Sequence, residues 1–354
     1  MGLAVYLLAA LLAGPSAGPP GPSPPESTAA VAGPESTAVT SRAVSAADAA
    51  RPEGAASESA RFVARHEISL FAADGEPGFR EPEAVSTDAF GDVFVADTGN
   101  HRVVQFDPAG RRIFEFGGYG WGTGELSGPT DVCAREGFRL FVVDAGNERI
   151  QQFDIRDKSV EGAVLPFATG QGLSGEALVR PRRMDLDAEG RIYVSDELSH
   201  CVWIFTPTGT LAAQLGGLGD APARFRSPAG VAVGPKGRVY VADAGNRRVQ
   251  VFDSIGNWLA SWGGPEESLF VEPQGIDVAP DGSVWVADVG SALVRRFTPE
   301  GIPLFSFGGP GDGPGKFRAP TDVAVGPRDR LWVVDRERGT VEGFRIESVA
   351  AAER

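Results

Sequence analysis

The sequence is poor in the residues that most often bind metals or act in catalysis. Its 354 residues include three histidines and two cysteines. Zinc sites combine several such side chains at short spacings, and no such spacing is present. Basic residues number 33 against 47 acidic ones, which gives a formal net charge of −14. This balance disfavours nucleic acids and anionic membrane surfaces as partners, because both attract basic surfaces.

Long apolar runs are also lacking. The eleven-residue run at residues 3–13 is too short to span a bilayer. Small residues follow it, so we interpret residues 1–17 as a secretion signal, although Met1-Gly2 offers no basic residue; a disordered apolar start is the alternative. Residues 18–60 are rich in Ala, Pro and Ser, and we predict a disordered linker. We therefore expect a periplasmic, cell-envelope or secreted protein without membrane insertion after signal removal.

The chain does contain a repeat. Each copy has an aromatic residue three positions before an Asp, Val two positions before it, and Phe nine positions after it. Successive copies of the Asp lie 47, 52, 47, 45 and 47 residues apart. The aspartates are Asp97, Asp144, Asp196, Asp243, Asp288 and Asp335. A repeat of this period made only of short strands indicates thin sheets that must stack on their neighbours.

These observations predict an all-β, six-bladed β-propeller of four-stranded antiparallel blades over residues 61–347. A proline begins the innermost strand of each blade: Pro82, Pro129, Pro181, Pro228, Pro273 and Pro320. The last copy lacks a fourth strand, while a spare one precedes the first copy at residues 66–71. We expect that N-terminal strand to join the last blade and close the ring, because an open ring would expose two long apolar edges.

The six repeated aspartates are not interpreted as a catalytic ring. Each stands at the end of a strand before a turn, where Asp commonly accepts backbone N–H groups. Because the residue is present in every copy, we predict a structural role in the turn.

Several repeats resemble the NHL repeat, through the phrases Asp97-Thr-Gly-Asn100-His-Arg102, Asp144-Ala-Gly-Asn147-Glu-Arg149 and Asp243-Ala-Gly-Asn246-Arg-Arg248. Three copies depart from the Asn and Arg positions, those at Asp196, Asp288 and Asp335. The resemblance implies a six-bladed propeller, with exported bacterial members closest in organisation. It further implies a binding platform for proteins, RNA or small ligands, and in a minority of members an enzyme.

Residues that follow the opening prolines are expected at the mouth of the central channel. The zinc histidines of the amidating lyase that shares this repeat have no counterpart here, because Glu83, Arg182, Gln274 and others stand at those positions. Calcium, as in lactonase-type propellers, could take oxygens from Glu83, Asp131 and Asp322, but Arg182 and Arg183 lie in the same ring and would repel a cation. We predict no catalytic residue, no metal and no cofactor.

The charges at these positions differ between blades, which a purely structural repeat does not require. We therefore predict a ligand-binding site at Glu83, Asp131, Arg182, Arg183, Gln274 and Asp322. The expected function is a non-catalytic exported scaffold that binds a protein or a small polar ligand there. A calcium-dependent hydrolase or lyase using the same mouth is the alternative, and ordinary solvated charge is a third interpretation.

The cysteines, two loops and the oligomeric state give three further expectations. Cys133 and Cys201 fall at different radii of adjacent blades, so we expect two separate thiols, one of them buried. The loops at 155–180 and 117–126 are candidates for shaping the site, the second through Tyr119 and Trp121. We expect a monomer.

Overall fold

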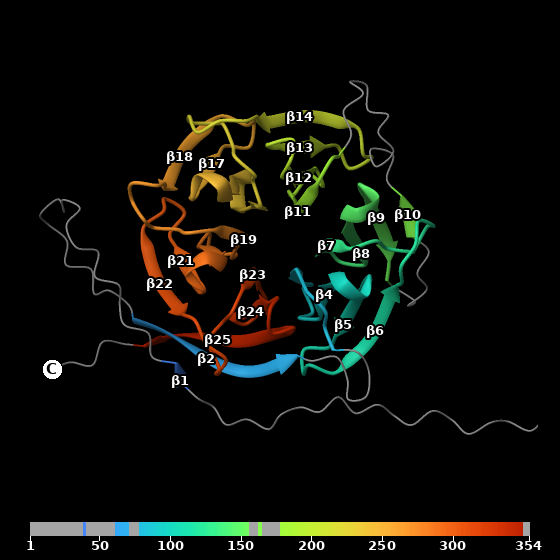
Figure 1. Cartoon of the computed structure of the whole chain (residues 1–354), viewed down its shortest axis with the longest axis horizontal. Helices are drawn as coiled ribbons and strands as arrows, with labels where there is room; N and C mark the ends of the chain where they lie inside the picture. Colours follow the sequence, from blue (N-terminus) through green and yellow to red (C-terminus); the bar gives the residue numbers. More distant parts are fainter. Residues whose placement is uncertain (1–37, 40–60, 71–77, 156–161, 165–177, 350–354) are drawn as a thin grey trace, which may run out of the picture.

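The computed structural model describes residues 38–39, 61–70, 78–155, 162–164 and 178–349. They form six antiparallel sheets arranged in a ring, each with its first strand towards the centre (Figure 1). Helical structure in the described residues is limited to short 3₁₀ turns, and none of it is long or apolar enough to cross a membrane. The predicted six-bladed propeller with four-stranded blades is confirmed. The predicted signal and most of the predicted linker lie outside the described residues.

Four strands follow the chain order from centre to rim in each of blades 1 to 5. Blade 1 contains β3 (Ala84–Thr87), β4 (Val93–Asp97), β5 (Arg102–Phe106) and β6 (Arg112–Gly117). Blade 2 contains β7 (Pro129–Glu136), β8 (Arg139–Asp144), β9 (Arg149–Asp154) and β10 (Gly162–Val164). Blade 3 contains β11 (Pro181–Leu186), β12 (Ile192–Asp196), β13 (Cys201–Phe205) and β14 (Leu211–Gly216).

The other blades follow the same plan. Blade 4 contains β15 (Gly230–Val233), β16 (Val239–Asp243), β17 (Arg248–Phe252) and β18 (Trp258–Gly263). Blade 5 contains β19 (Pro273–Val278), β20 (Val284–Asp288), β21 (Leu293–Phe297) and β22 (Pro303–Gly308). Blade 6 contains β23 (Pro320–Val325), β24 (Arg330–Asp335), β25 (Thr340–Val349) and β2 (Arg61–Leu70), with β1 (Ala38–Val39) beyond β2.

The sheet of blade 6 is built from both ends of the described chain. β2 pairs antiparallel with β25, with His66 opposite Phe344 and Leu70 opposite Val341. β2 begins five residues earlier than the predicted 66–71 strand, and residue 71 is outside the described residues. β25 continues past the end of its pairing with β24, so the extra length of β2 and β25 forms a two-stranded extension. There the Phe62 ring lies 6.1 Å from that of Phe305 in blade 5.

Both faces of a blade are buried, which explains the continuous apolar runs. In β4, Phe94 packs with Val132 and Val142 of blade 2. The next residue, Val95, points to the opposite face of the sheet and packs with Trp332 of blade 6. Each apolar layer is therefore shared by neighbouring blades.

Each repeated Asp fastens the loop that leads into its own blade. In blade 4 the fully buried Asp243 accepts the backbone N–H of Arg226 at 2.8 Å. Its second carboxylate oxygen accepts Asn246 and Arg248, each at 2.8 Å. The other five aspartates likewise accept backbone N–H groups 16 or 17 residues upstream. The predicted structural role is confirmed.

Candidate functional site

The mouth is defined here as the end of the channel where the innermost strands begin. Glu83, Gln274, Arg183, Asp131 and Asp322 are all at least nine-tenths buried. The side chain of Arg182 is 15% exposed. The structure brings five of the six predicted residues into one network of charges, whereas the side chain of Gln274 donates to Glu272.

Arg183 closes the channel just below the mouth. Its guanidinium donates to the carbonyl oxygens of Thr130 at 2.5 Å and Glu83 at 2.7 Å, and to that of Thr321 at 3.3 Å. These acceptors belong to blades 2, 1 and 6, so one side chain from blade 3 links three other blades across the axis. Arg183 Nε also lies 3.7 Å from Asp322 Oδ1. Burial opposes the charge, but Asp322, Asp131 and Glu83 together raise the pKa of Arg183.

Asp131 and Asp322 join neighbouring innermost strands. Asp131 accepts the backbone N–H of Met184 at 2.6 Å, and Asp322 accepts that of Val85 at 3.0 Å. Burial raises the pKa of Asp131, with the nearby Asp322 adding to the effect and Arg183 opposing it. Burial likewise raises the pKa of Asp322, to about 6. Both carboxylates therefore help to hold the ring together as well as lining the channel.

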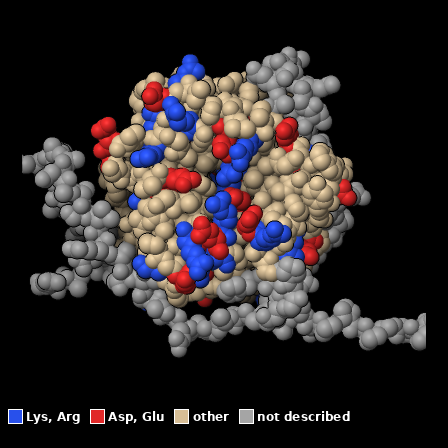
Figure 2. Space-filling view, viewed as in Figure 1, with Lys and Arg blue, Asp and Glu red and all other residues tan. Residues whose placement is uncertain are grey.

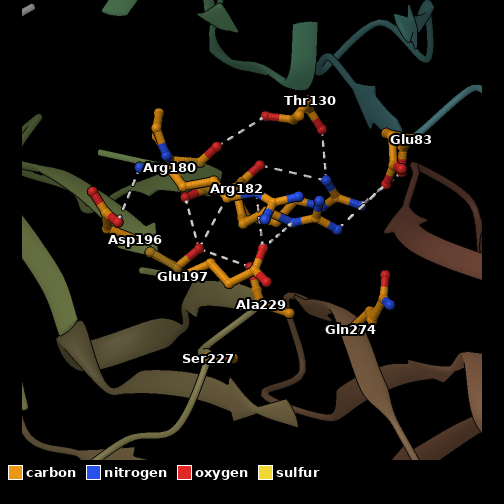
Figure 3. A network of polar contacts seen from close by, with 12 residues as sticks. Glu83, Thr130, Arg180, Arg182, Asp196, Glu197, Ser227, Ala229 and Gln274 are labelled. Carbon is orange, nitrogen blue, oxygen red and sulfur yellow. Dashed lines mark hydrogen bonds and ion pairs between the residues drawn. The ribbon is translucent and has the colours of Figure 1, made fainter. Parts of the chain in front are cut away.

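Glu83 and Arg182 face each other at the mouth itself (Figure 3). Glu83 Oε1 accepts Arg336 at 3.1 Å. Glu83 Oε2 lies 3.7 Å from the nearest nitrogen of Arg182, which is beyond hydrogen-bond distance. Arg182 Nε lies 3.8 Å from Glu197, which also faces Arg180 at 3.4 Å. Burial is the main cause of the lowered pKa of Arg182.

Glu197 and Arg336 were not predicted as members of this network, whereas Arg180 ends the 155–180 loop that was predicted to shape the site. Glu197 and Arg336 each directly follow the repeated Asp of their blade, in the turn between the second and third strands. Other copies carry Thr, Ala or Val at that position, so the change to a charged residue was the available signal. Figure 2 shows positive and negative side chains interleaved near the centre of one face of the ring.

Two hollows adjoin the mouth network. One, of about 570 Å³, lies between blades 1 and 6 and is lined by Glu83, Arg80, Arg336 and Arg338 among others. The other, of about 530 Å³, occupies the channel beyond Arg183 and includes Asp131 and Asp322 in its wall.

A second cluster of charged side chains crosses the channel beyond Arg183. Arg135 of blade 2 pairs with Asp185 of blade 3 at 3.1 Å and with Asp277 of blade 5. Asp185 also accepts the backbone N–H of Val233, and burial raises its pKa to about 6. Cys133 lines the same cavity, and burial raises the pKa of its thiol. Cys133 and Cys201 are both buried and unbridged, so the expectation of a single buried thiol was wrong.

The mouth does not fit a divalent cation. The carboxylates proposed as calcium ligands, Glu83, Asp131 and Asp322, surround the guanidinium of Arg183, and two of them accept backbone N–H groups. A cation there would have to displace a buried positive charge held by three carbonyl groups. Among the described ranges, no group of three or more His, Cys, Asp or Glu side chains is placed to hold a metal ion.

The histidines and loops take structural positions in the described part of the chain. His101 and His200 each accept a backbone N–H from the following blade, at 2.9 and 3.0 Å, and His66 contacts Glu342 at 2.6 Å. Tyr119 and Trp121 are 65% and 71% exposed on the 117–126 loop. Most of the 155–180 loop lies outside the described residues.

Comparison with known families supports the repeat. A family profile described as "NHL repeat" matches residues 79–106, 225–252 and 270–297. These matches fall in blades 1, 4 and 5. No curated protein matches the sequence.

Several solved structures share the fold. Virginiamycin B lyase from Staphylococcus aureus is 13% identical, with a TM-score of 0.53. The match covers 83% of this chain and 90% of the lyase chain. A gluconolactonase from Xanthomonas campestris is 17% identical over 80% and 90% of the two chains, with a TM-score of 0.57. A luciferin-regenerating enzyme is 14% identical over 79% and 96%, with a TM-score of 0.54. At these identities the similarity establishes the fold alone.

Proposed function

We propose that this chain, an NHL-repeat six-bladed β-propeller, is a binding protein that recognises a protein or a small polar ligand at the mouth of its channel. The observation that carries the proposal is the incomplete pairing of charged groups at the mouth. Glu83 and Arg182 are separated by 3.7 Å, and Glu83 Oε2 has no hydrogen-bond partner among the residues that the structure describes. Buried polar groups are normally satisfied, so a bound partner is a natural source of the missing contacts.

Catalysis at the same mouth is the alternative. The structural neighbours named above include enzymes, which favours a hydrolase or lyase, and lactonase-like chemistry would require calcium. The position of the Arg183 guanidinium among the candidate carboxylates argues against that metal. A chelator should therefore leave the melting temperature unchanged. A large fall that calcium reverses would favour the alternative.

The binding proposal is tested by capture of partners from an envelope extract. Arg182→Glu places a third carboxylate beside Glu83 and Glu197, so it should abolish capture of any partner that the wild-type chain retains. The matched control is Arg111→Glu, because the side chain of Arg111 is 72% exposed and pairs with Asp107 in the turn between β5 and β6, at the end of blade 1 away from the mouth. If Arg182→Glu captures every wild-type partner, the mouth is not the binding site.

Export is a separate proposal, because the predicted signal at residues 1–17 lies outside the described residues. A reporter that is active only outside the cytoplasm, fused after residue 60, should be active. It should lose activity when residues 1–17 are removed. If both fusions are inactive, export is contradicted.

A further inference from the structure

The chemistry of the mouth narrows the class of ligand, and this inference rests on the proposed function. Two deeply buried side chains there, Glu83 and Gln274, have unused acceptors, and the less buried Arg182 has unused donors.

Arg182 needs an acceptor. Within the described part of the chain its guanidinium donates no hydrogen bond and has only two ion pairs, at 3.7 and 3.8 Å. A guanidinium carries five N–H donors in a planar fork that suits a carboxylate. A carboxylate on the ligand would supply the acceptors that Glu83 and Glu197 are too distant to provide.

Glu83 and Gln274 need donors. Glu83 is 6% exposed and Gln274 is 8% exposed, yet Glu83 Oε2 and Gln274 Oε1 are buried atoms with no hydrogen-bond partner in the described part of the chain. The Gln274 amide is oriented with its nitrogen donating to Glu272 Oε1 at 2.8 Å, which leaves the oxygen free. In Figure 3 the Gln274 side chain extends towards the space beside Glu83 and Arg182. A group with several donors, such as an ammonium, fits two acceptors.

An apolar rim adjoins these polar groups. Val179, Leu198 and Val271 are 48%, 53% and 51% exposed. Val179 and Leu198 directly neighbour Arg180 and Glu197, which pair with each other, and Val271 directly precedes Glu272. At the positions of Val179 and Val271 the other four blades carry Arg or Ser: Arg80, Ser127, Arg226 and Arg318. The rim is thus a feature of blades 3 and 5, the blades that supply Arg182 and Gln274.

We infer that the mouth binds an α-amino acid with an apolar side chain, with its carboxylate on Arg182, its ammonium on Glu83 and Gln274, and its side chain against the rim. The two charged groups of such a molecule are attached to one carbon atom, so they suit protein charges of opposite sign only 3.7 Å apart. A simple carboxylate would leave both acceptors without a donor, and a simple amine would leave Arg182 without a hydrogen-bond acceptor. The amino acid offers a partner to each of the three side chains.

The test is calorimetric titration of the purified full-length chain with three matched probes: L-leucine, N-acetyl-L-leucine and L-leucinamide. The acetyl group removes the ammonium and the amide removes the carboxylate, while the side chain stays the same. We expect leucine to bind at one site and each derivative to bind at least about 10-fold more weakly, because each lacks one charge-assisted hydrogen-bonded contact.

Two variants locate the binding. Arg182→Gln and Gln274→Leu should each weaken leucine binding at least about 10-fold, and Arg111→Gln, in the turn between β5 and β6, should leave it unchanged. Melting temperatures near the wild-type value establish that the variants are folded. The inference is overturned if the derivatives bind as well as leucine, or if the folded wild-type chain does not bind leucine at millimolar concentrations. If a partner is still captured through Arg182 in that case, the proposed function stands and only the ligand class is wrong.

Discussion

At the scale of single residues, Arg183 and Arg182 are adjacent in the sequence but differ in their contacts. Arg183 donates to three carbonyl groups and lies beside the channel carboxylates. Within the described residues, Arg182 makes only the two long ion pairs given above. Neither the sequence nor the repeat distinguishes them, because the difference depends on which blades each side chain reaches across the axis.

Replacing Arg183 should therefore damage the fold far more than replacing Arg182. Arg183→Met leaves Asp131 and Asp322 buried without their positive partner, and it should destabilise the chain by about 3–5 kcal/mol. Urea denaturation measures this, with Arg182→Met as the matched control, which should destabilise the chain less because the ion pairs of Arg182 are long, at 3.7 and 3.8 Å. Equal effects of the two substitutions would contradict the assignment of Arg183 as the link between blades.

The channel carboxylates give stability an unusual dependence on pH. Burial raises the pKa values of Asp185 and Asp322 to about 6 in the folded chain, above the ordinary value of 3.8. A group with a raised folded pKa binds its proton more tightly in the folded state, so its contribution to stability is complete below pH 3.8 and lost as the pH rises through 6. The melting temperature should thus rise as the pH falls from about 7 to about 5.

Substitution by Asn identifies the responsible groups. Asp322→Asn retains an oxygen for the N–H of Val85 but cannot titrate, so the melting temperature of this variant should depend less on pH between about 5 and 7. Asp312→Asn, at an exposed carboxylate whose pKa is lowered by Arg318, should keep the wild-type dependence in this range. A wild-type melting temperature that falls on acidification from pH 7 to 5 would show that the sign is wrong.

At the scale of the strand and its turn, the same task is performed by different residues in different blades. In blade 4, Arg248 donates to the repeated Asp243 from five positions downstream. In blade 5 that position is Leu293, and Arg295, seven positions after Asp288, donates to Asp288 at 2.6 Å. Ser291 donates to the same oxygen in place of the Asn of other copies.

The contribution of each arginine to the stability of its blade can be measured. Arg295→Met and Arg248→Met should each destabilise the chain by a similar amount, of the order of 3 kcal/mol, because each leaves a fully buried carboxylate with one fewer positive partner. Arg111→Met is the control, because the side chain of Arg111 is 72% exposed and pairs with Asp107 in a turn between strands. If Arg295→Met is no more harmful than Arg111→Met, the turn of blade 5 is held in some other way.

The sequence predicted the elements well and the contacts between blades poorly. The number of blades, the opening prolines and the structural role of the repeated Asp all follow from one period and from local turn chemistry. The network at the mouth combines residues such as Glu83 and Arg336, which are 253 positions apart, so no local pattern indicates their contact. The spare strand was visible because the last copy is short, but its start at Arg61 lies upstream of the periodic pattern.

At the scale of the whole molecule, the ring depends on the pairing of β2 with β25. Removing residues 1–70 would expose the edge of β25 and leave the cluster around Leu70 incomplete. We expect this truncation to lower the melting temperature by more than about 10 °C or to make the chain insoluble. The matched control removes residues 1–60 and keeps β2, so it should melt near the wild-type temperature. Equal melting of the two truncations would mean that β2 contributes little to closure.

The central claim is that the repeated features build the ring and that the departures from the repeat at the mouth perform its function. Hydrogen exchange of the full-length chain, measured with and without the partner it captures, tests this most directly. The account predicts that added protection falls on residues 79–84, 179–183 and 271–275. Protection confined to the far end of the channel, around residues 133–136 and 276–280, would contradict it.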